Sequence, residues 1–300
     1  GMAATSAIFQ SLGRGAHVII PIDVYHGTRR LLKEIMLSLG IKMSEADMTN
    51  PDCVQEAIRP DTKLLWIETP SNPRLFITDI RSVTDIARKN NIIAVADNTW
   101  PSPLNQNPFE SGVDLVVHSA TKYLGGHSDI LAGAVVSPTN SEIFKIIRNI
   151  QISAGAVPSP GDCWLLIRSI KTLPVRIRTH NENAEKVASF LKGHPKIVHV
   201  YYPGFKEHPG HDIAKRQMMG FGGMISFEVK GGEDEAKRVV FSSELISPAT
   251  SLGGVESTWE HRLSSEGPDS QTPANLIRLS TGLEHYQDLI TDIENALNKI

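Results

Sequence analysis

Short apolar runs alternate with amphipathic stretches through the first half of the chain. Runs such as His17–Pro21, Lys63–Glu68 and Ile92–Asp97 are mostly apolar, as strands buried on both faces are. Between two of these runs, Asp79–Asn91 has apolar residues at helical spacing behind an aspartate suited to a helix N-cap. This alternation predicts an α/β fold, with a parallel or mostly parallel sheet covered by helices on both sides.

The second half of the chain has a different pattern. A long helix is predicted from about Pro174 to Lys192, followed by short strands that alternate with helices. We therefore expect a large domain over residues 1–172 and a smaller C-terminal α+β domain over residues 173–300. The polar stretch Glu256–Thr272 is expected to be an exposed loop.

Composition narrows the class of protein further. The 300 residues carry a formal net charge of −3, which gives no reason to expect a nucleic-acid or membrane partner. No apolar run is long enough to span a bilayer. Cys53 and Cys163 form neither a metal motif nor a disulfide framework, which indicates a reducing compartment. We predict a soluble cytoplasmic protein without a metal.

The first residues do not read as a targeting segment. The stretch Gly1–Ile8 has no basic region and no cleavage-like pattern. Small residues followed by Ile8, Phe9 and Leu12 instead predict a buried helix from the first residue. We expect the chain to begin inside a domain.

Polar residues follow several of the predicted strands directly. In parallel sheets, residues just past the carboxyl ends of strands line the functional site. Each of these residues alone suits a cap or a turn, but their joint placement predicts a site at this edge. They are Asp23, Tyr25, Glu68, Asn72, Asp97, Asn98, Thr99 and the run His118–Lys122.

Lys122 is the main candidate for a catalytic residue at this edge. It comes shortly after the apolar run Val113–Val117, with Ser119 and Thr121 beside it. Burial would lower the pKa of such an amine, and the hydroxyls can bind an anion, so the stretch suits a lysine that forms a Schiff base. A surface lysine in a loop is the alternative, and spacing alone does not choose between them.

Pyridoxal phosphate on Lys122 would make specific demands on the chain. A carboxylate must pair with the pyridine nitrogen, and Asp97 at a strand end suits that role. Tyr25, which follows another strand, suits an aromatic lid.

The phosphate and the substrate make further demands. A helix N-terminus at Gly1 and Met2, with the nearby hydroxyls, suits the phosphate. Arg278 interrupts an apolar strand, which suits either a substrate carboxylate or a structural ion pair.

These segments carry a family resemblance. The run Ser119–His127 resembles the lysine motif of the Cys/Met-metabolism pyridoxal-phosphate enzymes, which include cystathionine γ-synthases, cystathionine γ- and β-lyases and methionine γ-lyases. The resemblance covers essentially the whole chain in order. Its other segments are Gly1–Ala4, Asp23–Thr28, Glu68–Pro73, Ala96–Trp100, Ser251–Ser257 and Leu276–Glu284.

The resemblance implies a fold-type I architecture that works as a homotetramer, a dimer of dimers whose sites are shared between subunits. It implies catalytic roles for Lys122, Tyr25 and Asp97. It implies cofactor contacts from Gly1, Met2, Tyr25, Asn72, Asp97, Thr99, Ser119, Thr121 and Lys122. It implies substrate contacts from Arg30, Asn72, Ser251 and Arg278.

The sequence departs from the family pattern at four places. These 300 residues contain no segment that resembles the family's arm, which carries a tyrosine and an arginine to the neighbouring subunit's phosphate. Thr250 stands where γ-acting members usually have glutamate, and Gly27 stands where methionine γ-lyases have cysteine. The run Thr258–Arg262 differs from the usual threonine-histidine-alanine-serine run.

The resemblance predicts γ-elimination or γ-replacement on cystathionine or an O-acylhomoserine. The alternatives are another pyridoxal-phosphate enzyme of the same fold, such as a β-lyase or an aminotransferase, and a truncated subunit without activity. A nucleotide-binding α/β protein is less favoured, because no glycine-rich loop joins a strand to a helix.

Overall fold

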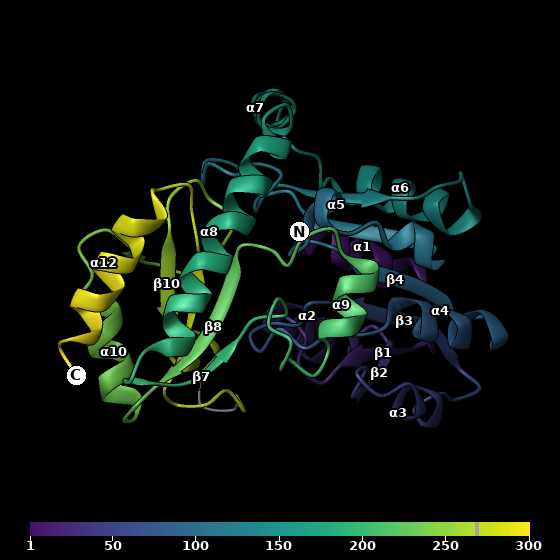
Figure 1. Cartoon of the computed structure of the whole chain (residues 1–300). Coiled ribbons are helices and arrows are strands. Elements are labelled where there is room, and N and C mark those ends of the chain that lie inside the picture. The colour runs from purple at the N-terminus through teal and green to yellow at the C-terminus, as the bar shows by residue number, and fades with distance from the viewer. Residues whose placement is uncertain (268–269) are drawn as a thin grey trace.

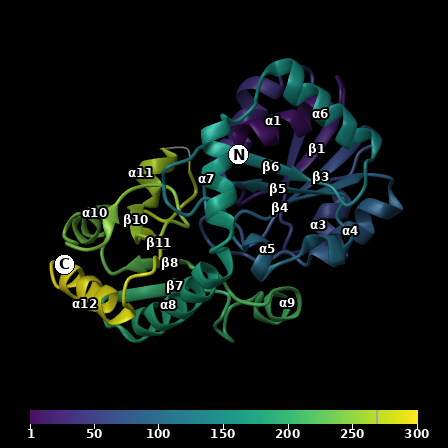
Figure 2. The same cartoon turned by 90° about the horizontal axis from the view of Figure 1, so that it is seen from above.

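The computed structural model describes residues 1–267 and 270–300, which build two β-sheets (Figure 1). The first sheet has six strands in the order β2-β1-β3-β4-β5-β6, and the second has five in the order β7-β8-β11-β10-β9. Seen from above, the sheets lie side by side with α7 between them (Figure 2). The predicted α/β fold with a second, smaller unit is confirmed.

The six-stranded sheet is mostly parallel, as predicted. Strands β1 to β5 pair in parallel, and β6 runs antiparallel to β5. Residues 120–132 join β5 to β6 without a helix, and a parallel pair would need a crossover connection. The strands are β1 (His17–Pro21), β2 (Lys42–Ala46), β3 (Thr62–Glu68), β4 (Ile93–Asp97), β5 (Leu115–Ser119) and β6 (Gly133–Val136).

Helices cover both faces of this sheet because alternate strand residues point to opposite sides. In β1, Val18 and Ile20 pack with α1 (Met2–Ser11), η1 (Leu32–Met36) and α6 (Glu142–Ala154). Ile19 packs on the other face with α3 (Pro51–Glu56) and α4 (Ile80–Lys89). The shorter elements are α2 (His26–Leu31), α5 (Ser102–Asn105) and η2 (Pro108–Ser111).

The five-stranded sheet packs one face against its own helices and turns the other toward the first sheet. Ile277 and Leu279 of β11 belong to the core with α8, α10 and α12, whereas Arg278 between them points the opposite way. The strands are β7 (Ile197–Tyr201), β8 (Met224–Val229), β9 (Ser247–Pro248), β10 (Thr258–His261) and β11 (Leu276–Ser280). The helices are α7 (Pro160–Ile170), α8 (Leu173–Gly193), α9 (His211–Gln217), α10 (Glu233–Phe241), α11 (Arg262–Glu266) and α12 (Tyr286–Leu297).

The expectation of an exposed loop at Glu256–Thr272 is wrong for the residues that the structure describes. This stretch contains β10 and α11, and Trp259 is fully buried. Glu260 and Arg262 pair with each other, and Glu260 also pairs with Arg278, so the segment is buried without being apolar. Residues 268–269 of this stretch lie outside the described residues.

The predicted boundary between residues 172 and 173 stays a prediction. It falls where α8 begins, and α8 contributes Ala184, Val187, Ala188 and Leu191 to the core of the second sheet.

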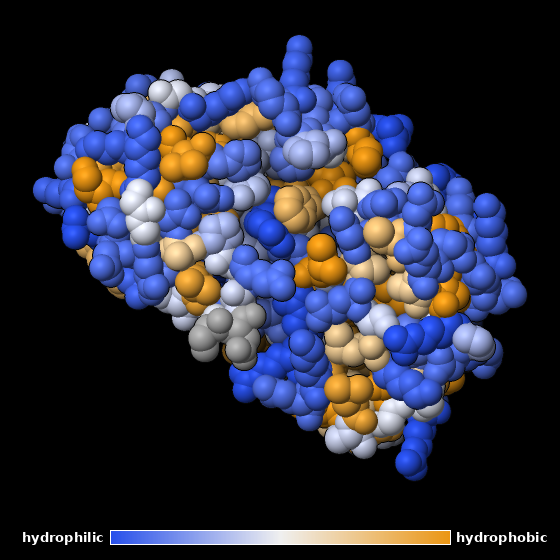
Figure 3. Space-filling model, turned by 90° about the horizontal axis from the view of Figure 1, so that it is seen from below, coloured by the Kyte–Doolittle hydropathy of each residue, from blue (hydrophilic) through white to orange (hydrophobic). Residues whose placement is uncertain are grey.

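Among the described residues, no helix is both long and apolar enough to cross a membrane. On the face seen from below, hydrophobic residues lie in separate patches among polar ones (Figure 3).

Replacement of Phe227 by alanine is expected to destabilise the second sheet strongly. Phe227 lies in β8 with no exposed surface, and loss of a buried phenylalanine costs about 3–5 kcal/mol. Phe241→Ala is the matched control, because Phe241 is 73% exposed. Thermal unfolding of both variants measures the difference. Equal melting temperatures would contradict the assigned core.

Candidate active site

A cavity of about 620 Å³ lies where the first sheet's strand ends meet the loop Thr250–Leu252 and strand β11. It collects residues from across the whole chain. All but one of the site residues predicted from the sequence line it: Gly1, Met2, Tyr25, Asn72, Asp97, Thr99, Ser119, Thr121, Lys122, Ser251 and Arg278.

Arg30 is the exception. It lies in α2, its side chain is 71% exposed, and it pairs with Glu34 one helical turn away. It does not line the cavity of this chain, so the structure does not bring Arg30 together with the other predicted substrate residues.

The Lys122 amine is held in the cavity by the second sheet's loop. Its Nζ donates a hydrogen bond of 2.6 Å to Oγ of Ser251. Burial lowers the pKa of Lys122 to about 8, and the guanidinium of Arg278 acts in the same direction. The amine is therefore neutral at mildly alkaline pH, which makes it both a nucleophile and a base.

Asp97 stands at the end of β4, opposite Glu68 in the register with β3. Its Oδ1 accepts hydrogen bonds from the backbone amide and the hydroxyl of Thr99, at 3.1 and 2.5 Å. Its Oδ2 accepts none from the described part of the chain. Burial raises the pKa of Asp97, so the carboxylate would gain from a cationic partner.

Glu68 and Tyr25 fix one wall of the cavity. Both carboxyl oxygens of Glu68 accept from the backbone amide of Tyr25, at 3.0 and 3.1 Å. Burial raises the pKa of Glu68 well above its usual range, and the charge of Asp97 adds to this effect. Tyr25 is the N-cap residue of α2 and lines the cavity.

An anion site can form at the N-terminus of α1. Gly1 is the N-cap residue of this ten-residue helix, and no acidic residue lies in its first turn. A Cβ added to Gly1 would come within 2.9 Å of Ser119, so a side chain does not fit there. The helix N-terminus and the side chains of Ser119 and Thr121 line one end of the cavity.

Arg278 is buried, and its guanidinium donates to several acceptors. Its Nη1 donates to Oδ1 of Asn72 at 3.1 Å, and its Nη2 donates to the carbonyl oxygen of Ser251 at 3.0 Å. Nη2 also pairs with Glu260 at 2.5 Å. Burial lowers the pKa of Arg278 to about 10. The guanidinium stays charged at neutral pH and can bind a carboxylate.

Further residues line the cavity that were not predicted from the sequence as site residues. His26, Thr250, Arg262 and Ser265 line it. Arg262 and Ser265 fell in the stretch expected to be a loop. The β-favouring pair Thr258-Trp259 was the available sign of a strand there.

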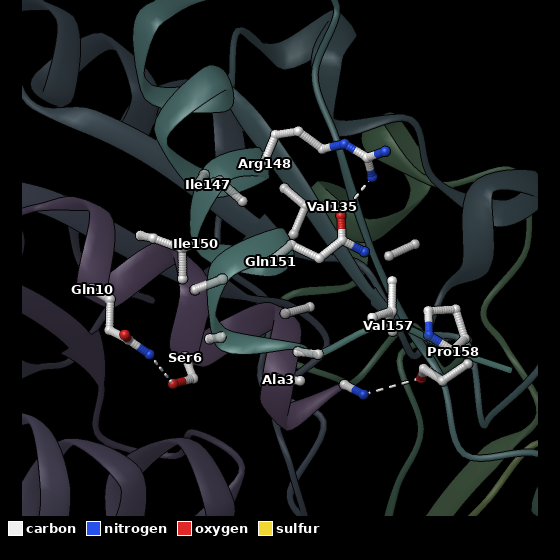
Figure 4. A pocket seen from close by; sticks show the side chains of 18 of the residues that line it. Ala3, Ser6, Gln10, Val135, Ile147, Arg148, Ile150, Gln151, Val157 and Pro158 are labelled. Atoms are coloured by element: carbon white, nitrogen blue, oxygen red, sulfur yellow. Dashed lines mark hydrogen bonds between the residues drawn. The ribbon is translucent and has the colours of Figure 1, made fainter.

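A second cavity, of about 600 Å³, adjoins the first (Figure 4). It lies among α1, β6 and α6, and small or apolar side chains such as Ala3, Val135 and Ile147 form most of its wall. Among the described residues that line it, there is no carboxylate, histidine, lysine or cysteine.

The first cavity fits pyridoxal 5′-phosphate. A lysine amine of lowered pKa, a buried carboxylate with one unpaired oxygen and a helix N-terminus are the groups that this cofactor needs. Together with the mostly parallel sheet, they define a fold-type I pyridoxal-phosphate enzyme.

Solved structures agree with this class. The chain superposes with a TM-score of 0.97 on the crystal structure of metB from Corynebacterium glutamicum, at 43% identity over 99% of this chain and 79% of that one. It superposes with a TM-score of 0.96 on cystathionine γ-lyase from Lactobacillus plantarum complexed with L-serine, at 38% identity over 100% of this chain and 80% of that one.

Comparison of the sequence with known proteins identifies the family. The family model for Cys/Met metabolism PLP-dependent enzymes matches residues 1–298, and the chain belongs to this family. It is 45% identical to a cystathionine β-lyase of Coxiella burnetii, over 99% of this chain and 79% of the relative. It is 43% identical to a cystathionine γ-lyase of Bacillus subtilis, over 100% of this chain and 81% of the relative. The predicted family, fold type and cofactor are confirmed.

The lowered pKa of Lys122 predicts pH-dependent reactivity of its amine. In the cofactor-free protein, acylation of Lys122 by an amine reagent should rise with pH and reach half its maximum near pH 8, because only the neutral amine reacts. Peptide mass mapping at each pH gives the extent of labelling. A midpoint above pH 10 would contradict the effect of burial.

Proposed function

We propose that this chain catalyses γ-elimination or γ-replacement on cystathionine or an O-acylhomoserine. The observation that supports this most directly is the Lys122 amine, of lowered pKa, facing a cavity that also holds Asp97 and Arg278. Relatives named cystathionine γ-synthase, from Mycobacterium leprae at 43% identity, and γ-lyase support the reaction class.

Bound pyridoxal 5′-phosphate supplies an electron-withdrawing ring that stabilises negative charge on the substrate carbons beside it. In the proposed roles, Lys122 holds the cofactor and then moves protons through Nζ once the substrate amine has replaced it. Its contact with Ser251, which also lines the cavity, restrains Nζ there. One amine can serve both proton positions because γ-chemistry removes protons from adjacent carbons.

Asp97 is proposed to pair with the pyridine nitrogen. Thr99 donates two hydrogen bonds to Oδ1 of Asp97, which leaves Oδ2 to pair with the pyridine nitrogen. A positive charge there would also offset the cost of burying the carboxylate. Tyr25 is proposed to cover the ring and assist proton transfer.

The phosphate and the substrate carboxylate are proposed to bind at separate places in the cavity. Gly1, Met2, Ser119 and Thr121 would hold the phosphate at the N-terminus of α1. Asn72, Ser251 and Arg278 would place the substrate carboxylate, because Arg278 already contacts both of the other two residues.

Cystathionine β-elimination is a second candidate, favoured by the 45% identity to a cystathionine β-lyase. The same residues suit both reactions, which differ in the carbon–sulfur bond of cystathionine that breaks. The products differ and therefore separate the two candidates.

The assembly and location are proposed from the family resemblance. A homotetramer with sites shared between subunits and a cytoplasmic location both fit a member of this family. The division into domains 1–172 and 173–300 is proposed from the two sheets and their separate cores.

Product analysis with cystathionine tests the proposed function. With the cofactor added, γ-elimination gives cysteine, 2-oxobutanoate and ammonia, whereas β-elimination gives homocysteine, pyruvate and ammonia. In γ-replacement, cysteine and an O-acylhomoserine give cystathionine and the free acid. We expect a γ-type product, and none from Lys122→Ala. Keto acid formed without release of a sulfur compound would instead indicate an aminotransferase.

Asp97→Asn should retain the cofactor but lower kcat by roughly 100-fold or more, because the amide cannot stabilise a protonated ring nitrogen. Asp288→Asn is the matched control, since Asp288 is exposed in α12 and does not line the cavity. Cofactor absorbance and steady-state rates measure both effects. An unchanged kcat in Asp97→Asn would remove Asp97 from this role.

A further inference from the structure

His26 and Arg262 meet at the cavity although 236 residues separate them in the sequence. His26 is the first residue of α2, beside the first sheet, and Arg262 is the first residue of α11, beside the second. Nη2 of Arg262 lies 3.4 Å from Nδ1 of His26, and both residues line the cavity. Neither has a role in the reaction proposed above.

Acidic neighbours hold the side chain of Arg262 in place beside His26. Its side chain is 2% exposed, and it pairs with Glu260 at 2.8 Å and Glu266 at 2.9 Å. Glu266 in turn accepts from the hydroxyls of Ser270 and Thr272, at 2.5 and 2.6 Å. Buried between two carboxylates, the guanidinium has little freedom to turn away from His26.

This contact decides which nitrogen of His26 carries a proton. A guanidinium only donates hydrogen bonds, so Nδ1 of His26 must be the acceptor. The neutral imidazole then carries its proton on Nε2. Burial lowers the pKa of His26, and the positive charge of Arg262 lowers it further, so the neutral form is favoured.

Nε2–H is consequently a donor that can serve a ligand in the cavity. Within residues 1–267 and 270–300, Nε2 of His26 makes no hydrogen bond. The ring packs edge-on against Tyr25, with ring centroids 4.7 Å apart, and this contact together with Arg262 restricts its rotation.

We infer that His26 is a specificity residue that donates from Nε2 to an oxygen of the substrate's γ-substituent, and that Arg262 is its positioning residue. The inference rests on the proposed function, in which Arg278 takes the α-carboxylate. Glu260 pairs with both arginines, and Arg262 contacts His26, so a chain of contacts links the His26 donor to that carboxylate site.

The ligand class follows from the chemistry of the donor. A neutral N–H, beside a guanidinium whose charge two carboxylates offset, suits a carbonyl or carboxylate oxygen. An ester carbonyl on homoserine or the distal carboxylate of cystathionine provides one, whereas a plain S-alkyl group does not. The contact would therefore favour oxygen-bearing γ-substituents over alkyl thioethers.

Equilibrium binding of two unreactive amino acids to the holoenzyme tests the contact. L-2-Aminoadipate has a distal carboxylate where L-norleucine has a methyl group. The measured quantity is the ratio of their dissociation constants, from calorimetry. In His26→Phe, the preference for aminoadipate should fall on the order of 10-fold, because one hydrogen bond to a charged group is lost, while norleucine binding is unchanged.

Further variants separate this role from a structural one. His26→Gln keeps a donor and should restore part of the preference, and Arg262→Lys should weaken it without abolishing cofactor absorbance. His199→Phe is the matched control, because His199 is exposed and does not line the cavity. An unchanged ratio in His26→Phe, or equal losses for both ligands, would overturn the assignment. The ratio does not depend on turnover, so failure of the proposed reaction would be seen separately, in product analysis.

Discussion

The site exists only where the two sheets meet, and the hydrogen bond between Lys122 and Ser251 marks that meeting. The lysine follows β5 of the first sheet, and the serine lies in the loop before β10 of the second. Arg278 of β11 reaches across the same junction to Asn72. The same docking buries the amine, and burial is the largest cause of its lowered pKa. Loss of the docking would therefore remove the geometry and the reactivity together.

Charge balance explains how this junction tolerates buried arginines. Arg262 and Arg278 share Glu260, and Arg262 also pairs with Glu266. Removing one member would leave a partner charged and buried, at a cost of several kcal/mol, of order 3–5. In the role proposed for Arg278, a substrate carboxylate competes with Glu260 for the guanidinium. Such an exchange of one carboxylate for another would favour ligands that offer further contacts, such as the one proposed for His26.

Short, nearly continuous apolar runs were enough to predict strands such as β1, β3 and β4, because these strands are buried on both faces. Strand-end positions then predicted Asp97 and Lys122 in one cavity. Glu256–Thr272 could not be predicted in this way, since its buried Glu260 and Arg262 pair with each other, with Glu266 and with Arg278 of the neighbouring strand, and charged residues carry no apolar pattern. Helical spacing likewise did not show that Arg30 pairs with Glu34 outside the cavity. Contacts such as Arg262 with His26 depend on how the two sheets dock, which no local pattern encodes.

Borohydride reduction of the purified chain with pyridoxal 5′-phosphate, followed by peptide mass mapping, tests the central claim most directly. The account predicts a visible absorbance band that reduction removes, with the mass of the reduced cofactor on the peptide that contains Lys122. Cofactor mass on a different lysine, with Lys122 unmodified, would contradict it.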